Sequence, residues 1–144
     1  MCMKLIKLSF TAFLAALFFF ACQSTVKISE DLSPAELIQR AQEASDRNRY
    51  KVALQYYEAL YDRNRTNLDL IITAEYEIAF IHYKQKRYAE AREGFTSLLE
   101  YYNTPDQALL PQHFKRLSEI VLVRIDEKEA QQNKHRFPWQ KKEA

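Results

Sequence analysis

The feature that most constrains the fold of this chain is a helical pattern that occurs twice. The two copies read RYKVALQYYEALYDRN and RYAEAREGFTSLLEYY, and Ala91 follows Ala53 by 38 residues. Each copy has the order aromatic, alanine, aromatic, leucine. A further alanine lies twelve residues before the alanine of each copy. These residues are Ala41, Tyr50, Ala53, Tyr57 and Leu60, then Ala79, Tyr88, Ala91, Phe95 and Leu98. Small residues let antiparallel helices cross closely, so the pattern predicts helix hairpins that stack on one another.

The rest of the sequence favours helices as well. The chain has one glycine and four prolines, too few for the turns of a sheet protein of this size. Ser33-Pro34-Ala35-Glu36 is a capping box that starts a first helix, which ends before the polar segment 46–49. Apolar spacing predicts four more helices, at about 50–61, 68–84, 88–102 and 112–129. The expected fold class is therefore all-α.

The first 22 residues predict export. Lys4 and Lys7 precede an uncharged run of 14 residues, from Leu8 to Ala21, which is shorter than the roughly 20 residues of a membrane-spanning helix. Ala21-Cys22 then resembles the lipobox of bacterial lipoproteins, in which the cysteine is lipid-modified after cleavage. Phe19 and Phe20 stand where that motif prefers leucine and a small residue. An ordinary signal peptide or an uncleaved anchor is the alternative.

After cleavage at this site, the remaining chain has equal numbers of positive and negative charges. The part from residue 22 onward has 123 residues, with 19 Lys and Arg against 19 Asp and Glu, which gives no electrostatic case for binding nucleic acid. With Cys2 removed and Cys22 lipidated, no thiol is left for a disulfide or a thiolate metal site. His82, His113 and His135 have no metal-ligand spacing, and no catalytic triad is legible. We therefore expect no enzyme, no metal and no cofactor beyond the covalent lipid on Cys22.

The doubled pattern resembles the tetratricopeptide repeat (TPR) family over about residues 34–102. Ala41 and Ala79 match its small residue in helix A, whereas Leu37 and Glu75 stand where the family has tryptophan. The resemblance implies a short solenoid of two repeats plus a C-terminal capping helix. A five-helix bundle with coincidental similarity is the alternative. Since three or more repeats are usually needed for stability, we expect the domain to self-associate or to dock on a partner.

The TPR resemblance also implies a binding surface, because inward-facing residues of helix A line a concave groove in that family. The expected partner-binding residues are Tyr76, Phe80 and Tyr83, with Thr73 and Lys84 beside them and Ile38, Gln42 and Asp46 continuing the groove more weakly. Aromatic anchors of this kind dominate interface energies. The alternative, which the sequence leaves open, is that the last helix covers the aromatic residues and that they are core.

These expectations divide the chain into a signal peptide (1–21), a lipid-anchored flexible tether (22–32), a TPR domain (33–130) and a disordered basic tail (131–144) that could also touch anionic membrane or a partner. The predicted function is a protein-interaction adaptor of the bacterial cell envelope. Gln23, in place of an aspartate, favours the outer membrane facing the periplasm. Two alternatives are a transport subunit with a small hydrophobic ligand in the aromatic groove and an adaptor of cell-wall hydrolases.

Overall fold

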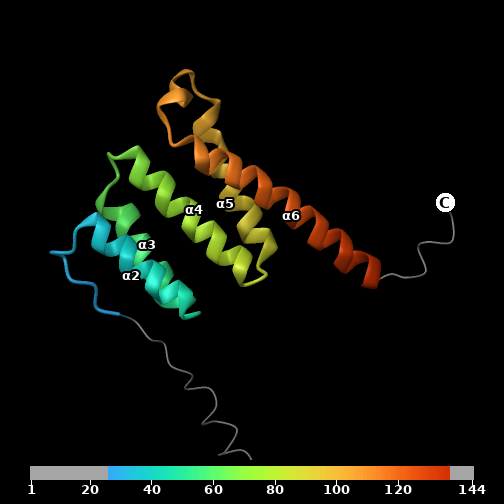
Figure 1. Cartoon of the computed structure of the whole chain (residues 1–144), viewed down its shortest axis with the longest axis horizontal. Coiled ribbons are helices and arrows are strands. Elements are labelled where there is room, and N and C mark those ends of the chain that lie inside the picture. The colour runs from blue at the N-terminus through green and yellow to red at the C-terminus, as the bar shows by residue number, and fades with distance from the viewer. Residues whose placement is uncertain (1–25, 137–144) are drawn as a thin grey trace, which may run out of the picture.

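The computed structural model describes residues 26–136. The expected signal peptide, Cys22 and residues 137–144 of the expected tail lie outside that range. Within it the chain has five α-helices, two short 3-10 helices and no strand (Figure 1), so the all-α class is confirmed. The elements are α2 (Pro34–Asp46), α3 (Tyr50–Arg63), α4 (Leu68–Lys84), α5 (Tyr88–Glu100), η1 (Tyr101–Asn103), η2 (Pro105–Leu109) and α6 (Gln112–Arg136).

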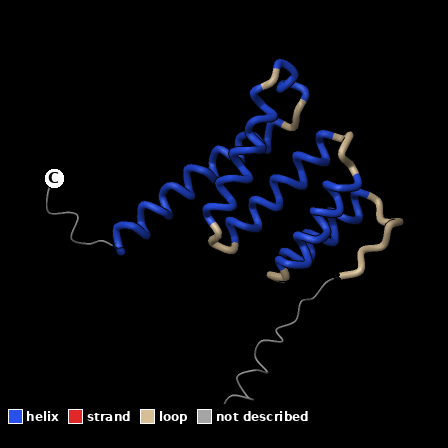
Figure 2. The backbone as a smooth tube through the Cα atoms, turned by 180° about the vertical axis from the view of Figure 1, so that it is seen from behind, coloured by secondary structure: helices blue, strands red, loops and turns tan. Residues whose placement is uncertain are grey.

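The helices form two hairpins and a final helix. Helix α2 pairs with α3 and α4 pairs with α5, while α3 packs on α4 and α6 packs on α5 and α4. The tube view in Figure 2 shows the hairpins lying side by side, with α6 running past the end of its neighbours. The predicted capping box is present, because the Ser33 backbone N–H donates to Glu36 Oε2 at 2.9 Å and the Glu36 N–H donates to Ser33 Oγ at 3.3 Å.

The turns inside the two hairpins have the same geometry. Asn48 and Lys86, which lie 38 residues apart, are the non-glycine residues with positive φ in the described chain, at 56° and 62°. After each of them a backbone N–H reaches back to close the preceding helix, from Arg49 to the Ala44 carbonyl and from Arg87 to the His82 carbonyl. A left-handed residue at this place is a common way to end a helix. The repeat in the sequence is therefore also a repeat in the backbone.

The residues of the doubled pattern form the core. The four pattern alanines are completely or almost completely buried, and so are the second aromatic and the leucine of each copy: Ala41, Ala53, Ala79, Ala91, Tyr57, Leu60, Phe95 and Leu98. The aromatics that open each copy, Tyr50 and Tyr88, are only partly buried. Each hairpin has its own hydrophobic cluster, and α6 adds Val121 and Ile125 to the second.

Helix α6 is longer than predicted. It was expected to end near residue 129, but it continues to Arg136, so residues 131–136 are helical and do not belong to a disordered tail. Arg92 of α5 binds the distal part of α6, with Nη2 2.6 Å from Asp126 Oδ1 and 2.7 Å from Glu129 Oε2. These ion pairs connect α6 to α5 in a part of α6 that has fewer apolar contacts.

The prediction of a flexible tether is wrong for residues 26–32, which we call the strap. Val26, Ile28 and Leu32 are partly buried against the core of the first hairpin. The Val26 N–H donates to Gln55 Oε1 at 2.8 Å, and Arg63 Nη1 donates to the Ser29 carbonyl at 3.0 Å. The sequence analysis judged the segment by its polar residues and missed that these three side chains can face one surface in an extended chain.

Candidate functional site

A groove of about 410 Å³ opens between α2, α4 and α6, with α3 behind it. Its lining combines three aromatic side chains, one aliphatic side chain and five other polar or charged side chains. The residues are Gln42, Ser45, Asp46, Tyr57, Tyr76, Glu77, Phe80, Lys84 and Leu117. Four of the seven residues predicted to bind a partner therefore line one groove: Gln42, Tyr76, Phe80 and Lys84. Asp46, expected to continue the groove, lines it too.

The two aromatic residues that α4 contributes to the groove have different roles. Tyr76 is 7% exposed, and its ring centroid lies 4.9 Å from that of Phe114 on α6 and 5.6 Å from that of Phe95 on α5. It is chiefly a core residue. The Phe80 ring stacks on Tyr76 at 5.9 Å and stays partly exposed. Helix α6 therefore covers the N-terminal part of the predicted aromatic row and leaves Phe80 at the groove wall.

Lys84 connects the two hairpins across the groove. Its ammonium group donates to Ser45 Oγ on α2 at 2.6 Å. It also lies 5.2 Å from the centre of the Phe80 ring and 5.8 Å from that of Tyr50, within the range of cation–π attraction. Asp46 and Lys84 occupy the same position in the two repeats, so equivalent places carry opposite charges.

The deepest polar groups of the groove are Tyr57 and Glu77. Tyr57 is fully buried, and its hydroxyl has no hydrogen-bond partner among the described residues. Burial raises the pKa of this phenol, and the nearby carboxylates of Glu77 and Asp46 raise it further. Burial also raises the pKa of the half-buried Glu77 carboxyl above 4.5, an effect that Lys84 opposes. The groove thus holds a buried hydroxyl without a hydrogen-bond partner in the described chain and a half-buried carboxylate that Lys84 attracts.

Three predicted binding residues lie elsewhere. Tyr83 stacks on Phe80 at 5.8 Å and contacts Tyr88 at 5.9 Å, on the side of α4 that faces α5. The Thr73 hydroxyl donates to the Asp69 carbonyl one turn back. Ile38 packs against the core of the first hairpin. None of the three is among the residues that line the groove.

Four lining residues were not predicted from the sequence: Ser45, Tyr57, Glu77 and Leu117. The Tyr57 ring belongs to the core of the first hairpin. Glu77 carried a signal that could have been used, because it is an acidic residue in the apolar part of LDLIITAEYEIAFIHYK. Ser45 and Leu117 come from helices that meet α4 only in the tertiary structure.

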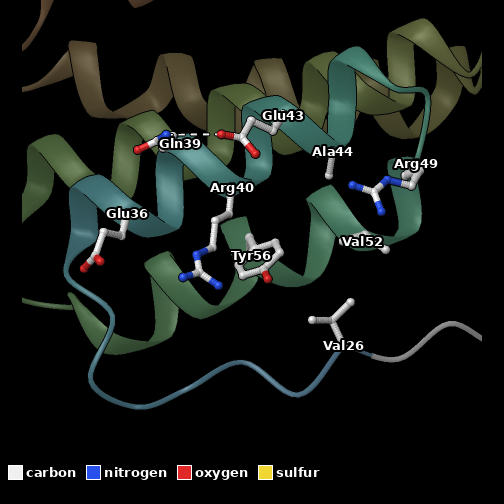
Figure 3. A pocket seen from close by; sticks show the side chains of 9 residues that line it. All are labelled: Val26, Glu36, Gln39, Arg40, Glu43, Ala44, Arg49, Val52 and Tyr56. Atoms are coloured by element: carbon white, nitrogen blue, oxygen red, sulfur yellow. Dashed lines mark hydrogen bonds between the residues drawn. The ribbon is translucent and has the colours of Figure 1, made fainter.

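A second pocket, of about 490 Å³, lies between the strap and the first hairpin. Figure 3 shows the side chains of Arg40, Tyr56 and Val26 turned toward this space. Gln39 and Glu43 at its rim hydrogen-bond each other at 3.1 Å. Its charged groups are all exposed side chains, from α2 and the α2–α3 turn, whereas the groove has the half-buried carboxylate of Glu77.

The described residues give no indication of metal binding or membrane crossing. No group of three or more His, Cys, Asp or Glu in residues 26–136 could hold a metal ion. No helix in that part of the chain is long and apolar enough to span a bilayer. His82 lies on α4 outside the groove lining. Burial lowers the pKa of its imidazole, and the nearby Arg87 lowers it further.

Comparison with known proteins gives one relative. An uncharacterized protein of Treponema pallidum (strain Nichols) is 35% identical to this chain over 117 residues. The match covers 79% of this chain and 47% of the Treponema protein, so the chain spans about half the length of the curated relative it matches. No family model matches the sequence. No solved structure matches it.

Proposed function

We propose that this protein is an exported, lipid-anchored adaptor that holds a protein partner in the groove between α2, α4 and α6. In this proposal its two hairpins and α6 form a short TPR solenoid, with α6 as a third helix A that caps the stack. The equal turn geometry at Asn48 and Lys86 supports a true structural repeat. The observation that carries the proposal is the groove itself, which gathers side chains from α2 and α4 at equivalent repeat positions.

The anchor in this proposal is the lipid on Cys22. The basic residues Lys4 and Lys7, the 14-residue apolar run and the Ala21-Cys22 pair support it. Gln23 after the cysteine supports location in the outer membrane, facing the periplasm. Val26 is docked on the first hairpin and lies four positions after the proposed lipid-carrying Cys22 in the sequence. The domain would then work close to the membrane surface.

A protein partner fits the groove better than a small hydrophobic ligand does. The volume of about 410 Å³ is adequate for a small molecule. However, three charged residues, Asp46, Glu77 and Lys84, line it beside the aromatic rings. A peptide offers polar and apolar groups together, as such a lining requires.

Crosslinking and purification from intact membranes test the binding role. The native protein is compared with a triple variant of exposed or half-exposed groove residues, Gln42→Ala/Phe80→Ala/Lys84→Ala. The matched control is Gln39→Ala/Arg40→Ala/Glu43→Ala, which changes the strap-pocket side of α2. A partner caught by the native protein and the control but lost in the groove variant supports the proposal. Equal capture by all three proteins contradicts it, and a co-purified apolar small molecule would favour the transport role.

The anchor is tested separately with Cys22→Ser. We expect the native protein to fractionate with membranes and to gain the mass of attached acyl chains, and the variant to lose both properties. Acyl-free native protein contradicts the anchor and leaves the groove proposal standing.

A further inference from the structure

We propose that the groove recognises a lysine or arginine side chain of the partner, which it binds with Glu77, Asp46 and the hydroxyl of Tyr57. This inference rests on the proposed function and adds the chemistry of the bound group. Glu77 is a half-buried carboxylate in the middle of α4. Within the described chain Lys84 attracts it electrostatically, but it makes no hydrogen bond and no close ion pair. Burying a carboxylate with so little compensation destabilises the fold, and a further cation in the groove would complete its site.

The Tyr57 hydroxyl is the second observation. Its side chain is 0% exposed, lines the groove and has no hydrogen-bond partner within residues 26–136. Buried hydroxyls normally have a partner. The oxygen can accept a hydrogen bond from an ammonium or guanidinium group. Glu77 and Asp46 line the same groove as Tyr57, so the two carboxylates and the hydroxyl belong to one site.

The charge balance of the groove favours a cation over an anion. Two carboxylates, Asp46 and Glu77, face the single ammonium group of Lys84, and no other charged side chain lines the groove. The Lys84 ammonium group already donates to Ser45 Oγ at 2.6 Å and lies over the Phe80 and Tyr50 rings. An incoming carboxylate would meet two like charges, whereas an incoming cation would meet two opposite ones.

The aromatic wall fits the rest of such a side chain. Phe80 is partly exposed and stacks on Tyr76, and both rings line the groove together with Asp46 and Glu77. The methylene groups of lysine or arginine pack well on such rings, and Leu117 provides an apolar contact from α6. Cations near aromatic faces gain a further attraction, larger when the site is desolvated.

The test uses the full-length protein, immobilised in detergent, and sets of acetylated, amidated octapeptides in which one central residue is fixed and the others are randomised. We expect peptides with fixed Lys or Arg to be retained roughly fivefold or more over those with fixed Asp or Glu. Glu77→Gln and Tyr57→Phe should reduce that ratio. Tyr57→Phe removes a buried hydroxyl that has no hydrogen-bond partner in the described chain, and Glu77→Gln removes only the charge of a half-buried side chain, so both variants are expected to fold. Glu93→Gln, exposed on α5 and away from the groove, is the matched control.

Three outcomes would overturn the inference. One is preferential retention of acidic peptides, which would make Lys84 the recognition residue. Another is retention without any charge preference. The last is a basic preference that Glu77→Gln leaves unchanged. Each of these still has peptides bound, so the proposed function would survive them. If no peptide set is retained and membrane crosslinking finds no partner, the groove proposal itself fails.

Discussion

Gly94 of α5 faces Ala79 of α4 so closely that a Cβ on Gly94 would lie 2.8 Å from the Cβ of Ala79. Real Cβ atoms do not approach to this distance. The one glycine of the chain therefore lies where the second hairpin needs a residue without a side chain. In the first hairpin the corresponding position, 38 residues earlier, is Tyr56, so the two hairpins do not pack identically.

The first prediction is that Gly94→Ala destabilises the protein. Alanine gains about 1 kcal/mol of helix propensity over glycine. Forcing a methyl group against Ala79 costs about 1–3 kcal/mol, so we expect a net loss on the order of 1 kcal/mol in the free energy of unfolding. Urea denaturation measures it. Adding Ala79→Gly to Gly94→Ala should recover part of the lost stability. If the two changes in the free energy of unfolding simply add in the double variant, that result contradicts the proposed contact.

The second prediction concerns Lys86, which has a φ of 62° in the α4–α5 turn. Left-handed backbone costs a residue with a side chain about 1 kcal/mol, whereas glycine adopts it freely. Lys86→Gly should therefore raise the free energy of unfolding by about 1 kcal/mol. Asn48→Gly should have a smaller effect, because asparagine tolerates this conformation and Asn48 Oδ1 accepts a hydrogen bond from the Tyr50 hydroxyl. Destabilisation by Lys86→Gly would show that the turn differs from the one described.

The sequence predicted those parts of the fold that depend on local pattern. The starts of α3, α4 and α5 were placed correctly at Tyr50, Leu68 and Tyr88, because each follows a polar break in apolar periodicity. The end of α6 was placed too early, since its last turns have no apolar face. Those turns follow the part of α6 that is ion-paired to Arg92 through Asp126 and Glu129. The sequence pattern does not show these ion pairs.

The candidate site was predicted only in part, because some of its residues come together only through tertiary contacts that the local pattern does not show. Gln42, Phe80 and Lys84 were expected from the resemblance to the TPR family, which implies a groove along these helices. Tyr57 and Glu77 were not expected there, because Tyr57 comes from α3 and lines one groove with Glu77 and Asp46 only when the hairpins pack. The position of α6 decides whether the predicted row of aromatic residues lines the groove or belongs to the core. Phe114 of α6 covers Tyr76 and leaves Phe80 partly exposed.

A third prediction is a pH-dependent gain of stability in Glu77→Gln. Burial raises the pKa of Glu77 above 4.5 in the folded protein, so the folded state binds this proton more tightly than the unfolded state. The native protein must therefore lose stability as pH rises through and above that value. At pH 7 the variant should have the higher thermal midpoint, and near pH 4 the difference should vanish.

Glu93→Gln serves as the control for the pH experiment, because Glu93 is exposed on α5. It should shift the midpoint little at either pH. A Glu77→Gln variant that is less stable than the native protein at pH 7 would mean that the carboxylate has a stabilising partner, and that result would also weaken the inference about a bound cation.

The fourth prediction concerns the strap. Ile28 is partly buried against the core of the first hairpin, so Ile28→Ser should lower the free energy of unfolding by about 1 kcal/mol. Amide exchange should speed up at Val26, whose N–H donates to Gln55, and remain slow in α4 and α5. Lys27→Ser, at the exposed neighbouring position, is the control. Fast exchange at Val26 in the native protein would contradict docking of the strap.

The most direct measurement of the central claim is site-specific photocrosslinking in living cells. A photoreactive phenylalanine is placed at Gln42, whose side chain lines the groove, and in a second strain at Gln39, on the strap-pocket side of the same helix. The account predicts a discrete crosslinked product from position 42 and none from position 39. Crosslinking from position 39 alone, or the same product from both positions, would place the partner outside the groove and contradict the account.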